Sequence, residues 1–422
     1  MSLSMTVKSA LPAGACEFVA AVNEPVKHDY IDALRGIAFL WVFLFHFNGF
    51  LPEAPPLATD IFKRGFAGVE LFYVLSAYTL SISLSSRAGE SGYLFGYAIR
   101  RLFRIAPMYW LAIGAYSAYF GFGARWHLGS GVGVTDILLN AFLLHGLDPN
   151  ALNGVVPGGW SVAVETQFYL LLPLLLRLSS TPRGLALTFV AAVILSFAGR
   201  PLIEAGLTAG AGVHGEVAHE FAYFSLISQL PVFLCGIGLF RISSWRRATI
   251  FHEGRIIGLS RHQASGALVL VVLAGFFPID FTVSPLRLFP DYSGFLGYGL
   301  LSALLIYALT LHDNGFITNP VTRYFGKISY GCYLLHHLMI QYVISHFPAL
   351  DGMMASLASL GLTAALASAA HRMVEEPGIV LGRRLLARLE LSNRRPQQSS
   401  EASPPLKRSE SSPGSAGVAV VV

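Results

Sequence analysis

The chain has 422 residues, of which 54% are hydrophobic and only 13% are charged. Soluble globular proteins average about 25% charged residues, so this composition excludes an ordinary water-soluble fold and predicts an all-α, polytopic membrane protein. The net charge of +5 does not indicate nucleic-acid binding, because the basic residues form short clusters between apolar segments, as membrane orientation requires. The three cysteines are far apart and lack metal-ligand spacing, so neither a disulfide framework nor a metal site is expected.

Residues 1–28 lack the sustained apolar core of a signal peptide and are interpreted as a soluble leader. The first apolar segment, residues 30–50, has about the length of a bilayer crossing and contains Asp32, Arg35 and His46. An Arg or Asp near the centre of a spanning helix costs roughly 2.5 to 3.5 kcal/mol. Three ionisable side chains in one span therefore indicate a functional use.

Arg35 and His46 are predicted to lie on one stripe of this helix. Eleven steps of about 100° return to within roughly 20° of the starting direction, with an axial rise of roughly 16 Å. Arg35 would then lie near one membrane surface and His46 near the bilayer centre, on one wall of a polar cavity. A purely structural alternative is a His bonded to a neighbouring carbonyl and an Arg that reaches lipid phosphate.

Nine further apolar segments predict a bundle of about ten spanning helices. They are residues 66–84, which include Glu70, and residues 105–122, 160–178, 185–203, 221–240, 266–277, 294–311, 328–344 and 354–370. A shorter apolar segment, residues 136–147, cannot cross a bilayer, and we expect it to be re-entrant or interfacial.

The distribution of Lys and Arg predicts the orientation of this bundle. If residues 136–147 do not span and the N-terminus is cytoplasmic, 23 of the 29 Lys and Arg residues fall on the cytoplasmic side, 5 fall on the opposite side, and Arg35 lies within the membrane. Both termini are then cytoplasmic. The membrane domain covers residues 29–385, and residues 386–422, rich in polar and basic residues, are expected to form a disordered cytoplasmic tail.

Arg101 and Arg104 stand three residues apart at the cytoplasmic end of the third predicted span, so both face the same side of a helix. Planar guanidinium groups bind phosphate through paired hydrogen bonds, and such a pair could hold a large phosphorylated ligand. The alternative is simple anchoring to lipid phosphate.

Glu165 lies five residues into the fourth span, which begins at Trp160, and Tyr169 follows one turn later on the same face. A carboxylate at that depth requires a partner, which His46 or Arg35 could supply. The structural alternative is an acidic residue favoured by the helix dipole near the headgroups.

The ninth span opens with Ser-Tyr-Gly-Cys-Tyr-Leu-Leu-His-His, in which Tyr330, Tyr333 and His337 form a polar stripe. Tyrosines at a membrane interface are ordinary, so this signal is weak by itself. The sequence Glu-Glu-Pro at residues 375–377 is interpreted as a helix stop after the last span.

Signatures of soluble enzymes are missing, including nucleophile elbows, HExxH zinc motifs and phosphate-binding loops. What remains is a His with Arg, Glu and Tyr inside a membrane. This set fits proton abstraction from a hydroxyl. It also fits the relay of a proton-coupled transporter, and the residues alone rate the two equally.

Several motifs in order make the chain resemble the bacterial membrane-bound acyltransferase-3 family. They are YIDALRGIAFLWVFLFHF with its Arg-x10-His, GVELFYVLSAYTL, RRLFRIAPMYW, WSVAVETQFYLLLPLL, FGKISYGCYLLHH and HRMVEEPG. One departure is Ala77, where the family usually has Gly, and this change is expected to narrow a close helix contact and alter the acceptor channel.

The resemblance implies an O-acyltransferase of the bacterial inner membrane with ten spans and a cytoplasmic acyl-CoA donor, usually acetyl-CoA. The acceptor would be a carbohydrate hydroxyl, free or lipid-linked, with membrane lipids as neighbours and no bound cofactor. His46 is expected to act as general base, Arg35 to orient His46 or to polarise the thioester carbonyl, and Glu165 to hold the other nitrogen of the imidazole. Arg101 and Arg104 would bind acyl-CoA. Acceptor or supporting roles fall to Asp32, Glu70, Trp160, Tyr169, Tyr330, Tyr333 and His337.

Overall fold

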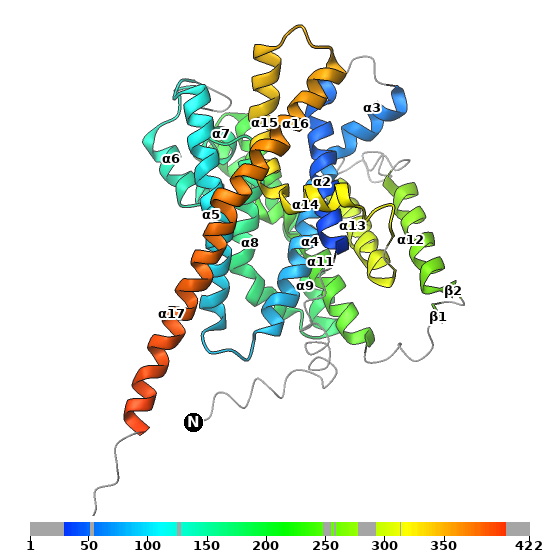
Figure 1. Cartoon of the computed structure of the whole chain (residues 1–422), viewed down its shortest axis with the longest axis vertical. Helices are drawn as coiled ribbons and strands as arrows, with labels where there is room; N and C mark the ends of the chain where they lie inside the picture. The colour runs from blue at the N-terminus through cyan, green and yellow to red at the C-terminus, as the bar shows by residue number, and fades with distance from the viewer. Residues whose placement is uncertain are drawn as a thin grey trace, which may run out of the picture.

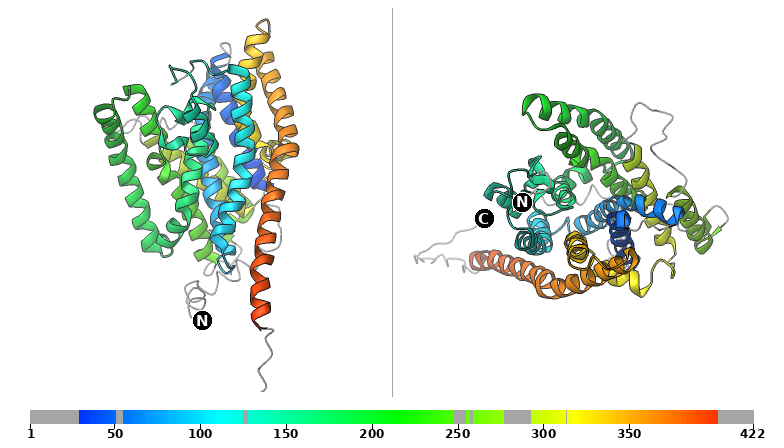
Figure 2. Two further views of the ribbon diagram at one scale, coloured as in Figure 1. Left: turned by 90° about the vertical axis from the view of Figure 1, so that its left-hand side faces the viewer. Right: turned by 90° about the horizontal axis from the view of Figure 1, so that it is seen from above.

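The computed structural model describes residues 29–50, 55–124, 128–247, 255–256, 259–276, 293–312 and 314–401. Over these residues the chain is helical, except for one short antiparallel pair of strands, β1 (Arg255–Ile256) and β2 (Leu259–Ser260). The long helices run roughly along a common direction (Figures 1 and 2). The predicted all-α class is therefore confirmed.

The helices in chain order are α2 (Asp29–Phe47), α3 (Pro56–Lys63), α4 (Ala67–Ser86), α5 (Tyr93–Phe120), α6 (Val134–Ala141), α7 (Ala151–Gly154), α8 (Gly159–Leu178), α9 (Pro182–Ala205), α10 (Gly215–Phe224), α11 (Leu226–Arg247), α12 (Arg261–Phe276), α13 (Ser293–Leu311), α14 (Pro320–Lys327), α15 (Ser329–His346), α16 (Gly352–Ala370) and α17 (Glu376–Glu401). Short 3₁₀ turns are η2 (Asn48–Phe50), η3 (Arg64–Phe66) and η4 (His145–Leu147), and π segments are η5 (Gly206–Gly210) and η6 (His371–Glu375).

Helix α4 lies at the centre of the bundle, in contact with α2, α11 and α13. Apolar residues surround most of its circumference, and only a buried helix can use such a pattern. Ala77, the departure from the family motif, is fully buried and faces Gly236 of α11. It lines neither of the two cavities described below.

The short helix α14 crosses α2 at very close range. A Cβ atom added to Gly36 would lie 1.9 Å from the carbonyl oxygen of Thr322, and one added to Gly326 would lie 1.7 Å from that of Asp32. Two glycines thus allow backbone to meet backbone. Arg323 of α14 also forms an ion pair with Asp29, which fixes α14 against the start of α2.

Six helical stretches in the described residues are long and apolar enough to cross a membrane: Asp29–Phe50, Pro56–Ser86, Gly159–Leu178, Pro182–Gly210, Gly215–Trp245 and Gly352–Leu389. Two shorter apolar helices, Arg261–Phe276 and Phe295–Leu311, coincide with two more of the predicted spans. The remaining predicted spans fall on α5, which includes three arginines, and α15. The expected count of about ten is therefore not established by length and composition.

Residues 136–147 form the end of the eight-residue helix α6 and the 3₁₀ turn η4. Eight residues of α-helix extend about 12 Å, which is far less than the bilayer core. This segment is too short to span.

The C-terminal region differs from the prediction. Residues 375–377 do not stop the helix, because α16 continues through the π segment η6 into α17, where Pro377 occupies the first turn and needs no hydrogen-bond acceptor. Residues 386–401, expected to be disordered, are helical, since this stretch still contains strong helix formers such as Leu, Ala, Glu and Arg. Helix α17 projects beyond the bundle (Figure 1). Residues 1–28 and 402–422 lie outside the described part of the chain.

Candidate active site

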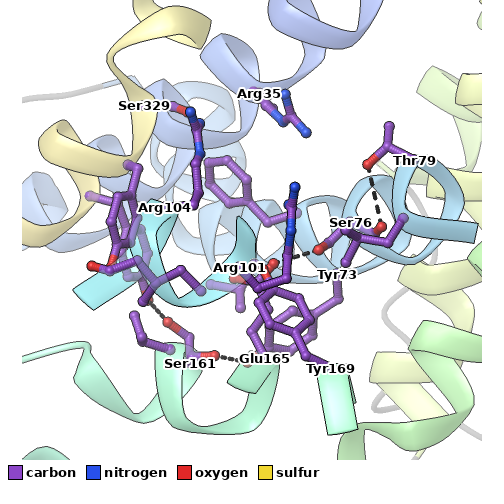
Figure 3. A pocket seen from close by; sticks show the side chains of 17 residues that line it. Arg35, Tyr73, Ser76, Thr79, Arg101, Arg104, Ser161, Glu165, Tyr169 and Ser329 are labelled. Atoms are coloured by element: carbon purple, nitrogen blue, oxygen red, sulfur yellow. Dashed lines mark hydrogen bonds between the residues drawn. The ribbon is translucent and has the colours of Figure 1, made fainter. Parts of the chain in front are cut away.

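A cavity of about 120 Å³ lies among α2, α4, α5, α8 and α15, and we call it the arginine cavity. Its basic residues are Arg35, Arg101 and Arg104. Figure 3 shows their guanidinium groups at one end of the space, with Glu165 and Ser161 toward the other. The spacing of Arg101 and Arg104 on α5 therefore brings both into one site, and α2 supplies the third guanidinium from the opposite wall.

Glu165 faces this cavity from α8, where it accepts a hydrogen bond from the Ser76 hydroxyl of α4. Thr79, Ser161 and Ser329 add further hydroxyl groups to the lining. Tyr169 and Tyr330 line the same space, and the Tyr330 hydroxyl donates to the Ile105 carbonyl at 3.0 Å. The cavity thus combines positive charge with many hydroxyl donors, a combination suited to phosphate and carbonyl oxygens.

Arg104 is held from behind by Glu375 of η6, at 3.0 Å between Nη1 and Oε1. The Glu375 side chain is fully buried, and its other oxygen lies 2.9 Å from Nδ1 of His371. The π segment η6 therefore supplies both Glu375 and His371. A buried carboxylate that pairs with Arg104 fixes the direction of the guanidinium toward the cavity.

A second cavity of about 600 Å³, which we call the histidine cavity, is lined by His46 and His337. Aromatic and apolar residues form most of its wall, and Trp160 stacks on Phe224 with ring centroids 3.9 Å apart. Glu70 also lines it from α4. The Glu70 side chain is buried, and its Oε2 has no hydrogen-bond partner among the described residues.

The imidazole rings of His46, His336 and His337 form one cluster. The His46 ring centroid lies 4.1 Å from that of His337 and 5.2 Å from that of His336. Nδ1 of His336 lies 2.6 Å from the Tyr333 carbonyl, so it carries the proton and donates. Helix α15 therefore surrounds the His46 ring with two further imidazoles.

The two cavities share a wall formed by Val69 and Tyr333, which line both. The Tyr333 hydroxyl accepts a hydrogen bond from Ser161 at 2.8 Å and lies 3.3 Å from the Gly158 carbonyl, to which it donates. These bonds hold the phenol across the boundary. The arginine cavity therefore adjoins the cavity that contains His46.

The start of α8 serves both cavities, since Trp160 faces the histidine cavity and Glu165 faces the arginine cavity. His145 of η4 fixes this start: its Nε2 lies 3.0 Å from the Gly159 carbonyl and 3.0 Å from the Tyr109 hydroxyl. Burial lowers the pKa of His145 to about 4. Within the described part of the chain the His145 Nδ1 has no hydrogen-bond partner, so the neutral ring fits the site.

The structure brings together nearly all the side chains singled out from the sequence. Arg35, Arg101, Arg104, Glu165, Tyr169, Tyr330 and Tyr333 line the arginine cavity, and His46, Glu70, Trp160, Tyr333 and His337 line the histidine cavity. Asp32 lines neither and lies 3.7 Å from Arg35, as an ion pair one turn away on α2.

Two expectations about this site are wrong. Arg35 and His46 do not line one cavity but two adjoining ones, which share Val69 and Tyr333 as lining residues. Glu165 does not orient His46, since it lies in the arginine cavity on Ser76, whereas the rings beside His46 are imidazoles of α15. Which cavity each side chain lines depends on how segments far apart in sequence pack together, and sequence patterns do not give that packing.

Sequence reasoning missed several residues that the fold places at the site. His336 was noted only as a neighbour of His337, and Glu375 only as part of a helix stop. Ser76 and Thr79 stand among the apolar residues of α4, so no pattern in the sequence indicates that their hydroxyl groups line a cavity. The Glu-Glu-Pro sequence could have suggested Glu375, because a carboxylate at the end of a span needs a cation.

The fold and the site define a helical membrane protein with one arginine-lined and one histidine-lined cavity. The model of the family described as "Acyltransferase domain" matches residues 28–372, and the chain belongs to this acyltransferase family. The resemblance expected from the motifs is confirmed.

Related proteins are found in bacteria and in a virus. A Staphylococcus aureus (strain COL) protein named "Putative O-acetyltransferase" is 25% identical over 382 residues, covering 82% of this chain and 56% of its own length. A Bacillus subtilis (strain 168) protein named "Putative peptidoglycan O-acetyltransferase" is 24% identical over 74% of this chain and 49% of its own length. An Acidianus two-tailed virus protein named "Putative acetyltransferase" is 24% identical over 73% and 82%, respectively.

The chain thus spans little more than half the length of the Staphylococcus relatives that it matches. No solved structure matches it.

Proposed function

We propose that this protein is a membrane O-acyltransferase that moves a short acyl group, acetyl in the simplest case, from acyl-CoA to a carbohydrate hydroxyl. The observation that carries the proposal is the shared wall of Val69 and Tyr333 between a cationic cavity and a histidine cavity. Such a pair of sites suits a reaction in which donor and acceptor enter from different sides. Family membership favours acyl transfer over the proton-coupled transporter that the same residues could build.

The donor is assigned to the arginine cavity. Arg101 and Arg104 bind phosphate oxygens of CoA, and Glu375 keeps Arg104 directed toward them. Arg35 lines the same cavity and adds a third guanidinium group for the donor phosphates. Polarisation of the thioester by Arg35 does not fit this arrangement, because eleven residues of α2 place Arg35 about 16 Å along the helix from His46.

The acceptor is assigned to the histidine cavity. Sugar rings present apolar faces and hydroxyl edges, and this cavity offers Trp160 and other aromatic faces together with Glu70 as hydrogen-bond acceptor. The name of the Bacillus relative supports a glycan acceptor. An exopolysaccharide or lipopolysaccharide unit, free or lipid-linked, fits the same chemistry.

In the transfer step the pantetheine arm of the donor extends past Val69 and Tyr333 into the histidine cavity. There His46 accepts the proton of the acceptor hydroxyl, and the resulting oxygen nucleophile attacks the thioester carbonyl. The new carbon–oxygen bond forms as the carbon–sulfur bond breaks. The proton on His46 then passes to the departing CoA sulfur. No oxidant, reductant or bound cofactor is consumed.

The proposed topology has ten spanning helices, namely the six long apolar stretches together with α5, α12, α13 and α15. The 23-to-5 distribution of basic residues supports cytoplasmic termini in a bacterial inner membrane. Acyl-CoA would then reach the arginines from the cytoplasm.

Sealed vesicles of both orientations test this function. Acetyl-CoA added outside should release CoA thiol, in the presence of a glycan acceptor, only from vesicles that expose the cytoplasmic face. Acetyl esters should accumulate on the glycan, and surface glycans of cells should lose O-acetyl groups when the protein is removed. Absence of thiol release with every glycan class tried would reject the proposal.

A further inference from the structure

The cluster of His46, His336 and His337 has a property that proton transfer by His46 does not use. One ring nitrogen from each of the three residues lies within 4.8 Å of the other two. His46 comes from α2 and the other two from α15, about 290 residues later, so no local spacing in the sequence indicates the group. Imidazole is a preferred ligand of Zn²⁺ and related divalent ions.

The hydrogen bonding of His336 leaves its Nε2 available to bind a metal ion. Its Nδ1–H donates to the Tyr333 carbonyl at 2.6 Å, which leaves the lone pair on Nε2. This Nε2 is buried and has no partner among the described residues. Metal-binding histidines commonly have their second nitrogen held by a carbonyl in this way, because the bond fixes the tautomer and the ring.

The cavity beside the three imidazoles gives a cation access to them and contains a carboxyl group. His46 and His337 line the histidine cavity, so a fourth coordination position faces open space. Glu70, buried in the same lining with an Oε2 that has no hydrogen-bond partner among the described residues, places a carboxyl group in the same cavity. Zn–N bonds of about 2.1 Å require the nitrogens to approach one another more closely, which rotations of the two cavity-facing rings can provide.

We propose that His46, His336 and His337 bind one Zn²⁺ ion and that its binding inhibits the enzyme. Coordination occupies the lone pair with which His46 would accept the proton of the acceptor, so a metal-bound cluster cannot act as base. Binding stands independently of the proposed function, whereas inhibition rests on it.

Binding is tested with the full chain in detergent or nanodiscs, freed of metal by chelator and titrated with Zn²⁺ or, for its absorption spectrum, Co²⁺. The wild type should bind one equivalent of metal ion. In His46→Gln and in His337→Gln the affinity for the metal ion should be at least about tenfold weaker. His346→Gln is the matched control on α15, because His346 is exposed and contacts only its own helix and nearby aromatic rings. Circular dichroism and gel filtration establish that the variants are folded.

Inhibition is tested in the acyl-transfer assay. Stoichiometric Zn²⁺ should suppress transfer by wild type and His346→Gln, and chelator should restore it. In His337→Gln the Zn²⁺ concentration for half inhibition, measured against that variant's own metal-free rate, should rise at least about tenfold. Binding unaffected by the His46 and His337 changes overturns the site, and activation by Zn²⁺ overturns the inhibitory role. If transfer is not observed at all, the binding titration still decides the site and only the proposed function fails.

Discussion

The arginine cavity and the histidine cavity are neighbours with different chemistry. The first is small, about 120 Å³, and presents three guanidinium groups and several hydroxyls. The second is about 600 Å³ and presents aromatic faces, imidazoles and a buried carboxylate. The difference indicates that the cavities hold different partners, one recognised by charge and the other by shape and hydrogen bonding.

The same contrast separates binding from chemistry. Charge-assisted contacts to phosphate contribute mainly to affinity, whereas a base contributes mainly to rate. Substitutions in the two cavities should therefore produce different defects, and each prediction below tests whether that division is real.

The largest effect is expected for His46→Ala in the histidine cavity. Loss of the general base should reduce acyl transfer by roughly 10²- to 10⁴-fold while a non-hydrolysable CoA analogue still binds. His346→Ala, on an exposed position, is the control. If His46→Ala abolished CoA binding, the two cavities would not divide the work as proposed.

Arg101→Ala should produce the opposite defect in the arginine cavity. Loss of one charge-assisted hydrogen bond weakens binding by about 1.5 to 3 kcal/mol, or roughly ten- to a hundred-fold, and added salt should weaken wild-type binding as well. Analogue binding is compared with Arg177→Ala, which changes an exposed arginine at the end of α8. Normal binding with no transfer would contradict the assignment of Arg101 to donor phosphate.

Gly326→Ala tests the support of the arginine cavity. The new Cβ would meet the Asp32 carbonyl oxygen, so α14 must move away from α2 near Arg35. Overpacking of this kind typically costs about 1 to 3 kcal/mol of stability. Thermal unfolding should show the loss, and Gly361→Ala in α16, where the added atom meets open space, should show none. Equal stability of the two variants would mean that α14 can move away from α2 without a measurable loss of stability.

The smallest effect concerns His145, which holds the start of α8 and hence both cavities. Its pKa is about 4 when folded and near 6.5 when unfolded, so the unfolded state binds more protons between these values. Stability should therefore fall as the pH drops below about 6.5, with a loss of about 1 kcal/mol by pH 5.5. Unfolding curves of wild type and His145→Gln across pH 5 to 8 measure this slope, which the variant should partly lose. An unchanged slope would contradict a neutral, buried His145.

Sequence patterns identified the individual side chains of the site well, because ionisable residues inside apolar segments stand out. Arg35, Arg101, Arg104, Glu165, His46 and His337 all line a cavity. What the patterns could not provide was pairing between segments. Glu165 accepts a hydrogen bond from Ser76 of α4, and two imidazoles beside His46 come from α15.

The fold shows the same limit. Most apolar segments coincide with helices to within a few residues, as for α4, α8 and α13. Helix α5, however, begins at Tyr93, twelve residues before the predicted start, since the basic residues Arg100, Arg101 and Arg104 separate its apolar first turns from the rest of the helix and interrupt the apolar signal. The short helix α14 was not predicted, because its role depends on the fit of Gly326 against α2, which only the packed structure reveals.

The wall between the cavities also has a consequence for the energy supply of the cell. Any channel that let water cross between the cavities would conduct protons and dissipate the gradient that the membrane maintains. Tyr333, fastened by Ser161 and the Gly158 carbonyl, places an aromatic ring and an occupied hydroxyl at this point. A phenol bonded in this way limits the passage of water, and hence the leakage of protons, between the two cavities.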